Sequence, residues 1–412
     1  MQENKDLKPS KEEKNLVLIV ENANTELKRI LTDAFMYGWN KQLVKSKVDA
    51  LIDETLKLLN EAEATDDLIK STEIGLKQTF LREWRETTTL IKQKAKSDKT
   101  GILALTLARM LNTETPMKIV DNGGIIIGFT KNDVAIASGG VTNLRDFMTE
   151  VENAAANRFV DYASLVEDAI VDVTEKIADG SLSATAIRHN PNGTTSVVHK
   201  SIRNMAEIET RYQLIVDDIK RQGLELNKDY VVASSHPNAS ERCSWWQGKL
   251  FLLDIDVASR TMGQYKAGTT PTQDILEYKD GKPVYSLKQA CEQGFLSFNC
   301  QHRLVKYYKG INPPKYDLVT VNKDRALTTR QRVLENRIRK YKARAEMSQS
   351  GVHQKFTDPF TGKRRVMSQK TYNEKMSKYW QEKYKELAIN NDLPIYIWRT
   401  RITLTEREMR NL

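Results

Sequence analysis

The fold of the central part of the chain depends on residues 234–251, which read SSHPNASERCSWWQGKLF, and on residues 285–311, which read YSLKQACEQGFLSFNCQHRLVKYYKGI. These stretches hold all three cysteines and two of the five histidines of the 412-residue chain. They lie in the least regular part of the sequence, residues 236–322. Residues 230–236, YVVASSH, predict a strand that leads into the first stretch. An odd number of widely spread cysteines excludes a disulfide scaffold and is typical of a reducing compartment.

Four side chains in the two stretches are of the types that bind zinc. His236 and Cys243 lie seven positions apart, and Cys300 and His302 follow in the second stretch, two positions apart. Thiolate and imidazole groups are preferred zinc ligands in tetrahedral sites, so we predict that His236, Cys243, Cys300 and His302 bind one zinc ion. The spacing lacks a tight CxxC pair, and a second interpretation stays open. In this second interpretation the cysteines are small buried side chains and the histidines are hydrogen-bonded core residues. For the zinc interpretation, Cys291 is a spare candidate ligand.

A cysteine nucleophile is a weaker interpretation of the same residues. Cys300 and His302 would share one face of a strand, because side chains at positions i and i+2 point the same way. A catalytic pair of this kind also needs a third, orienting group, and the sequence offers none. Trp245 and Trp246 are interpreted as core or interface anchors. We therefore predict that neither cysteine is a catalytic nucleophile.

Outside this region, the spacing of apolar residues predicts mostly helix. Apolar side chains recur every three or four positions near residues 16–35, 48–62, 74–95 and 103–111, and no proline occurs between Pro9 and Pro116. Residues 117–140 contain a Gly-Gly pair and a β-branched run, which predict a hairpin. Helices are predicted again over 143–179 and 201–227, with a turn-rich connector over 180–200.

The predicted fold class is α+β, with an N-terminal helical region, a central mixed α/β module with small sheets, and long basic C-terminal helices. Residues 358–362 (Asp-Pro-Phe-Thr-Gly) interrupt these last helices, and the tail at 393–404 is apolar and β-prone. The predicted division is a helical N-terminal region at 1–115, a small hairpin with a helix connector at 116–200, a module with the Cys/His cluster at 201–322, and a basic helical region at 323–412.

Positive charge is concentrated near the C-terminus. The net charge of the chain is +10, but residues 301–412 carry 26 Lys and Arg against 11 Asp and Glu, a net +15. Such a segment can neutralise phosphates and bind nucleic acid, or it can be a solvated helical surface. The residues predicted to contact nucleic acid or an acidic partner surface are Arg332, Arg337, Arg339, Lys340, Lys342, Lys363, Arg364 and Arg365.

Membrane insertion and secretion are not predicted. No segment approaches the ~18–20 uncharged apolar residues of a membrane span. The first residues, MQENKDLKPSKEEKN, are polar and lack the apolar core of a signal peptide. We expect the protein to be made and used in a cytoplasm, or in a particle assembled there.

Several positions of the two stretches together resemble the phage minor capsid protein 2 family of phages of Gram-positive bacteria, which is similar to the Mu-type head morphogenesis proteins. The resemblance spans roughly residues 180–400, where 205–212 (MAEIETRY) and 331–342 (QRVLENRIRKYK) resemble helices of the family. Cys243 stands where we expect the family to have histidine, and both residue types are zinc ligands. The matching positions are Ser234, His236, Arg242, Cys243, Trp246, Gln247, Gly248, Lys249, Asn299, Cys300, His302, Tyr307, Tyr308 and Gly310.

The resemblance implies a structural minor head protein without an active site. It would reside in the virion near the portal vertex, after assembly in the host cytoplasm, with the portal protein, the major capsid protein and packaged DNA as partners. The roles implied are head assembly, DNA packaging or genome delivery. A virion-associated enzyme, either ADP-ribosyltransferase-like or a zinc-dependent nuclease, is the alternative. The residues expected to have a structural role are Arg242, Trp246, Gln247, Gly248, Lys249 and Asn299.

Overall fold

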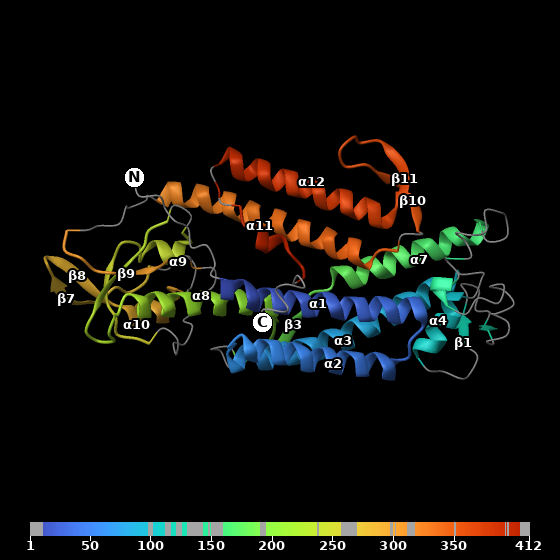
Figure 1. The fold of residues 1–412 in the computed structure, drawn as a ribbon, viewed down its shortest axis with the longest axis horizontal. Helices are drawn as coiled ribbons and strands as arrows, with labels where there is room; N and C mark the ends of the chain where they lie inside the picture. The colour runs from blue at the N-terminus through green and yellow to red at the C-terminus, as the bar shows by residue number, and fades with distance from the viewer. Residues whose placement is uncertain are drawn as a thin grey trace. The chain divides into compact units, whose positions relative to one another are not determined.

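The chain folds into two compact units, each assembled from segments that are far apart in the sequence (Figure 1). Unit 1 consists of Met1–Val17, Asn204–Leu334 and Lys385–Tyr396. Unit 2 consists of Leu18–Arg203, Glu335–Tyr384 and Ile397–Leu412. The computed structural model describes residues 11–97, 102–111, 117–120, 126–129, 143–146, 149, 160–189, 195–236, 239–256, 270–296, 300, 302–310, 318–349, 352–391, 393 and 395–403.

Unit 2 begins with a group of helices. They are α1 (Lys11–Tyr37, in unit 2 from Leu18), α2 (Lys41–Glu61), α3 (Asp66–Ala95) and α4 (Ile102–Met110). The side chain of Asn40 accepts a hydrogen bond from the Leu43 backbone N–H and caps α2, and Thr65 does the same for α3. These caps satisfy backbone donors that have no partner within the helix. Helices α2 and α3 lie side by side (Figure 1), and α4 packs on α3.

A β-hairpin and a further helix of unit 2 are also positioned next to α3. Strand β3 (Ser183–His189) lies against α3 and pairs antiparallel with β4 (Thr195–Ser201), and α7 (Val160–Asp179) also contacts α3. Gly75 of α3 lies very close to the side chain of Ile202. A Cβ atom at this glycine would lie 2.9 Å from Cγ1 of Ile202. A further antiparallel pair is formed by β1 (Met117–Val120) and β2 (Ile126–Phe129).

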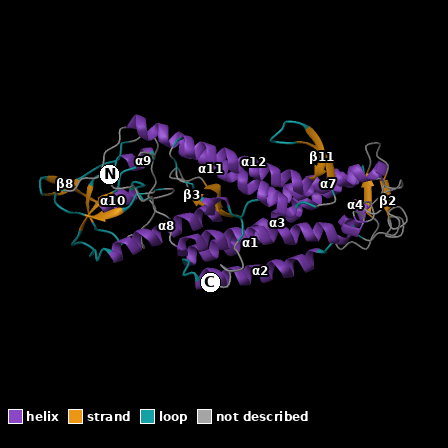
Figure 2. Ribbon diagram, turned by 45° about the horizontal axis from the view of Figure 1, so that its top comes forward, coloured by secondary structure: helices purple, strands orange, loops and turns teal. Residues whose placement is uncertain are grey.

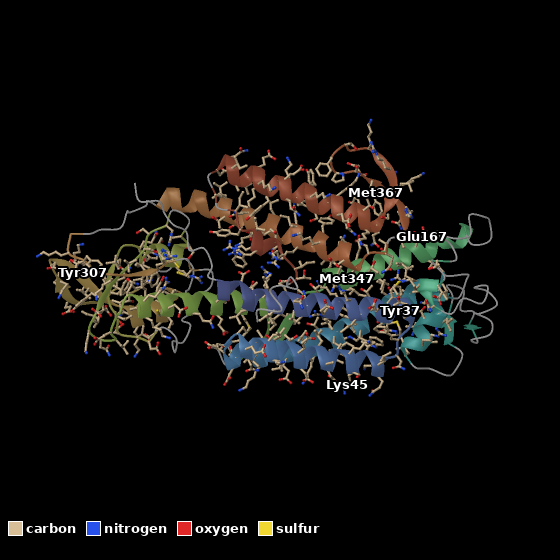
Figure 3. The ribbon with its side chains drawn as sticks, in the orientation of Figure 1. Tyr37, Lys45, Glu167, Tyr307, Met347 and Met367 are labelled. Atoms are coloured by element: carbon tan, nitrogen blue, oxygen red, sulfur yellow. The ribbon has the colours of Figure 1, made fainter. Side chains whose placement is uncertain are left out.

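The C-terminal segments complete unit 2. They are the second half of α11 (Leu318–Met347), the hairpin of β10 (His353–Thr357) and β11 (Arg364–Ser368), most of α12 (Gln369–Asn390), and the 3₁₀ turn η1 (Ile397–Thr400). Met347, labelled in Figure 3, is 1% exposed and belongs to a core cluster with Ala178, Ala343 and Ile402. The N-terminal and C-terminal parts of the chain therefore share one hydrophobic core.

Unit 1 is built around a five-stranded sheet with short helices (Figure 2). The strand order is β7-β8-β6-β5-β9, and only β6 and β8 pair in parallel. Trp246, Phe251 and Phe295 are buried in its main core, where their rings contact one another. The elements are α8 (Ile202–Arg221, in unit 1 from Asn204), β5 (Tyr230–Ala233), α9 (Glu241–Ser244), β6 (Leu250–Leu252), β7 (Ile275–Lys279), β8 (Lys282–Ser286), α10 (Leu287–Glu292), β9 (Leu304–Lys306) and the first half of α11.

The α+β prediction is confirmed, with helices toward both ends of the chain and small sheets between them. The structure differs from the sequence prediction at 180–200, where a regular hairpin replaces the expected connector. It differs again after residue 393, where the described residues form a 3₁₀ turn in place of a strand. The two compact units are discontinuous in sequence, since α11 and α12 each have residues in both, and the division into four consecutive domains stays a prediction. None of the described helices has the length and apolar character to cross a membrane.

Candidate functional site

The two stretches that open the sequence analysis meet at the edge of the sheet in unit 1. Strand β5 pairs with β9, which places Ser234 beside Arg303. The Ser234 backbone N–H donates to the Arg303 carbonyl (2.9 Å), and the Arg303 N–H donates to the Ser234 hydroxyl oxygen (2.8 Å). The residues just after β5 therefore lie next to those just before β9. This pairing brings together chemical groups that are about 60 positions apart in sequence.

A compact turn returns the chain from α9 to the sheet. The N–H of Gly248 donates to the carbonyl of Ala233 (3.0 Å), and the residue adopts a φ of +67°, a conformation that glycine reaches without strain. The side chain of Gln247 accepts a hydrogen bond from the backbone N–H of His236. The WQGK segment thus holds the loop that carries His236 against the end of β5.

Three of the four predicted metal ligands are brought together in this module. The ligand atoms of Cys243, Cys300 and His302 all lie within 4.8 Å of one another. Cys243 is 1% exposed, Cys300 is 7% exposed and His302 is 2% exposed. The Cys300 sulfur lies 3.2 Å from Nδ1 of His302. The third thiol, Cys291, is buried in the same core but does not belong to this group.

His236, the fourth predicted ligand, lies beside the group of three. Its ring is perpendicular to that of His302, with 4.8 Å between the ring centroids. Its Nε2 lies 3.0 Å from the hydroxyl oxygen of Ser234. The described arrangement therefore contains three converging ligand atoms and one adjacent imidazole that is directed to a serine.

The two clustered thiols differ in acidity. The pKa of Cys243 lies well below its ordinary value, chiefly because it shares a hydrogen bond with Cys300 and further because His302 hydrogen-bonds to it. Burial raises the pKa of Cys300 well above its ordinary value, and the neighbouring Cys243 adds to the rise. Cys243 is therefore the more acidic thiol of the pair.

The residues expected to have a structural role pack around this group. Trp246 is fully buried against Phe251 and Phe295. Lys249 donates a hydrogen bond to Gln273, and its ammonium group lies 4.3 Å from the centroid of the Tyr285 ring. Arg242 is partly buried in α9, next to Cys243. Asn299 lies outside the described residues.

Five of the eight predicted cationic contact residues are on α11 and interact within the chain. Arg332 pairs with Glu207 at 3.5 Å, and Lys340 pairs with Asp179 at 2.9 Å. Arg337 lies 4.2 Å from the centroid of the Trp380 ring. Arg339 donates to the carbonyl of Arg399, and Lys342 donates to that of Thr400 (2.8 Å). Burial lowers the pKa of Lys342, which is partly buried.

The other three residues lie on the β10–β11 hairpin and are exposed. Lys363, Arg364 and Arg365 form the turn end of β11, and no ion pair joins them to an acid within the described part of the chain. The turn is organised by Asp358, which accepts hydrogen bonds from the N–H groups of Phe360 and Thr361. Sequence reasoning found the break at 358–362 but missed Asp358 and the flanking strands, although Asp-Pro followed by glycine is a turn signal.

Comparison with the sequence models of known protein families gives a match. Residues 208–412, about half of the chain, match the sequence model of a family of phage capsid proteins. The chain is therefore a structural protein of the phage virion. The family is the one described as "Phage minor capsid protein 2", and the chain belongs to it, as the resemblance predicted. No curated protein and no solved structure matches the chain.

Proposed function

We propose that this minor capsid protein acts near the portal vertex, in head assembly, DNA packaging or genome delivery, and that its β10–β11 hairpin contacts packaged DNA. The observation that supports the proposal is the set of three consecutive exposed cations, Lys363, Arg364 and Arg365, within the family region. Arginine and lysine in such a row neutralise phosphates and release counterions. The α11 cations contribute less to this contact, because they already interact within the chain.

A rigid support makes the hairpin suitable for this contact. The carboxylate of Asp358 accepts a hydrogen bond from Lys375 of α12 (2.6 Å), which is the main reason that its pKa falls to about 2. The ring of Phe356 stacks on Tyr372, with 4.3 Å between the centroids. Both contacts tie the hairpin to α12, so the cations are presented without a large loss of conformational entropy on binding.

A structural role is favoured over an enzymatic one by the burial of the Cys/His group. A catalytic thiol or imidazole must reach its substrate, and Cys243, Cys300 and His302 are all at most 7% exposed. In the described residues Cys243 and Cys300 belong to the same hydrophobic core cluster as Trp246 and Phe295. We therefore assign the Cys/His group no role in catalysis. The proposed partners of the protein are the portal protein, the major capsid protein and DNA.

The test compares two triple variants of the full chain. The first variant removes the hairpin charges and is Lys363→Gln/Arg364→Gln/Arg365→Gln. The matched control removes three exposed charges from α2 and α3 and is Lys41→Gln/Lys45→Gln/Lys70→Gln. Lys45 is labelled in Figure 3. Fluorescence anisotropy measures binding to duplex DNA over a range of salt concentrations. We expect the plot of log K against log salt to be less steep for the hairpin variant, with the magnitude of its slope smaller by about 2–3. The control variant should leave the slope almost unchanged.

Three other outcomes have a defined meaning. Equal slopes for the hairpin variant and the wild-type chain would exclude DNA contact by the hairpin. A variant that binds DNA normally but no longer associates with purified portal protein would assign the hairpin to an acidic portal surface. Absence of the chain from portal-containing precursors would contradict the location near the portal.

A further inference from the structure

The ligand atoms of Cys243, Cys300 and His302 have the spacing of a metal site. Zinc lies about 2.3 Å from a thiolate and about 2.0 Å from an imidazole nitrogen, which puts tetrahedral ligand atoms about 3.6–3.8 Å apart. The three atoms here are all within 4.8 Å of one another, and the Cys300 sulfur and His302 Nδ1 are 3.2 Å apart. Adjustments of a few tenths of an ångström to about one ångström convert this arrangement into a coordination sphere.

His302 is unusually placed for a residue that only fills the core. It is 2% exposed, and its Nε2 has no hydrogen-bond partner among the described residues. The other ring nitrogen, Nδ1, faces the thiol group of Cys300 at 3.2 Å and is the atom placed to bind a metal. Metal ligation gives such a buried ring a strong interaction and fixes its orientation.

A fourth ligand is available next to the group. The His236 ring lies edge-on to His302, and its backbone is held in place by Gln247. The His236 Nε2 shares a hydrogen bond with the hydroxyl of Ser234, and exchange of this bond accompanies a turn of the ring toward the sulfur atoms. The hydroxyl of Ser234 keeps its contact with the N–H of Arg303 when this happens.

We infer that Cys243, Cys300, His302 and His236 bind one Zn²⁺ ion that holds the loop after β5 to the segment before β9. Four protein ligands leave no open coordination position, which is typical of a structural site and not of a catalytic one. The two thiols lose their protons when the metal binds. The inference is independent of the DNA contact proposed for the β10–β11 hairpin.

The test begins with the unmodified full chain. The protein is produced in medium with added zinc, purified under reducing conditions, dialysed, and analysed for metal by mass spectrometry. One zinc per chain is expected. Replacement by Co²⁺ should produce the visible absorption of a tetrahedral site and the near-ultraviolet band of cobalt–thiolate bonding. A folded, reduced chain that retains no zinc and shows no such bands would overturn the inference.

Variants then identify the ligands. Cys243→Ser, Cys300→Ser and His302→Ala should lose the metal, while Cys291→Ser, an equally buried thiol of the same core, should retain it. His236→Ala should weaken zinc affinity at least about tenfold. Unchanged affinity in this variant would remove His236 from the ligand set. Because serine in the core can itself impair folding, circular dichroism of each variant is recorded.

A control separates metal binding from oxidation. Cys243 and Cys300 are close enough that a disulfide is the competing explanation for protection of these thiols. Thiol titration of the zinc-free, unfolded protein should find three free cysteines. Finding one would show that the pair is oxidised and would contradict the inference.

Discussion

At the scale of single residues, Glu167 shows how burial changes the chemistry of a side chain. This residue of α7, labelled in Figure 3, is half-buried, and burial raises its pKa from 4.5 to about 7 although the nearby His353 lowers it. Asp168 adds a further, unfavourable negative charge. The folded chain therefore keeps a proton on Glu167 at pH values where the unfolded chain has released it.

This difference predicts a pH dependence of stability. Between about pH 4.5 and about pH 7 the folded state binds more protons than the unfolded state, so the contribution of Glu167 to stability falls as pH rises. Glu167→Gln removes this loss. The melting temperature of the variant minus that of the wild type should increase from about pH 5 to about pH 8.

Differential scanning fluorimetry at constant ionic strength measures this difference. Glu54→Gln, on the exposed face of α2, controls for the loss of one negative charge. A difference for Glu167→Gln that stays constant with pH, or that decreases, would contradict the assignment.

At the scale of elements, Gly75 shows how a helix and a hairpin are fitted together. It lies inside α3, where glycine is unfavourable, and its missing side chain makes room for Ile202 at the end of the β3–β4 hairpin. Ile202 is fully buried, so it has no open space into which to move. The close approach of α3 and this segment therefore depends on the glycine.

Gly75→Ala should destabilise the protein although it improves helix propensity. Alanine gains about 1 kcal/mol in an isolated helix, whereas overpacking a tight contact costs about 1–3 kcal/mol. We expect a net loss of about 1 kcal/mol in the free energy of unfolding measured with urea.

The compensating double variant tests the contact itself. Ile202→Ala removes the two atoms that lie closest to the new methyl group, Cγ1 at 2.9 Å and Cδ1 at 3.2 Å. The cost of Ile202→Ala should therefore be smaller in the Gly75→Ala background than in the wild type. If Gly75→Ala stabilises the chain, or the two costs simply add, the tight contact is not the reason for the glycine.

At the scale of the whole molecule, the family region is not a self-contained folding unit. Arg344 of α11 pairs with Glu175 and Asp179 of α7, and Thr25 of α1 donates to the carbonyl of Ile402 (2.9 Å). The described residues of 335–384 and 397–403 thus complete the core of unit 2 together with residues up to 203. The family region, 208–412, lacks these earlier residues.

A fragment of residues 208–412 is therefore expected to fold only in part. Ala343 and Met347 would be exposed without α7, and the fragment should bind the dye ANS and lose its cooperative transition in urea. Co-expression with residues 1–207 should restore a cooperative transition and remove ANS binding. A fragment that unfolds as cooperatively as the full chain would contradict the shared core.

The sequence predicted the helices well because their apolar periodicity is a local property. The stripes near residues 16–35 and 74–95 correspond to α1 and α3. It did not predict the β3–β4 hairpin, because the turn-rich character of residues 180–200 indicated only a connector. The strands of this hairpin are stabilised by packing against α3, as in the bond from the Thr185 N–H to Gln78, and such a contact is not encoded locally.

The candidate site likewise has features that the sequence determines and features that depend on the tertiary structure. The residue types and the WQGK and NCQH patterns identify the family and the chemical groups, since these depend on composition and order along the chain. Which groups converge is decided by the pairing of β5 with β9, which places Cys300 and His302 near Cys243 and turns His236 toward Ser234. Likewise, charge is a property of the sequence, but only packing decides that Lys342 is used internally while Arg364 is exposed. Local patterns act over a few residues, whereas distances across a core are set by the chain as a whole.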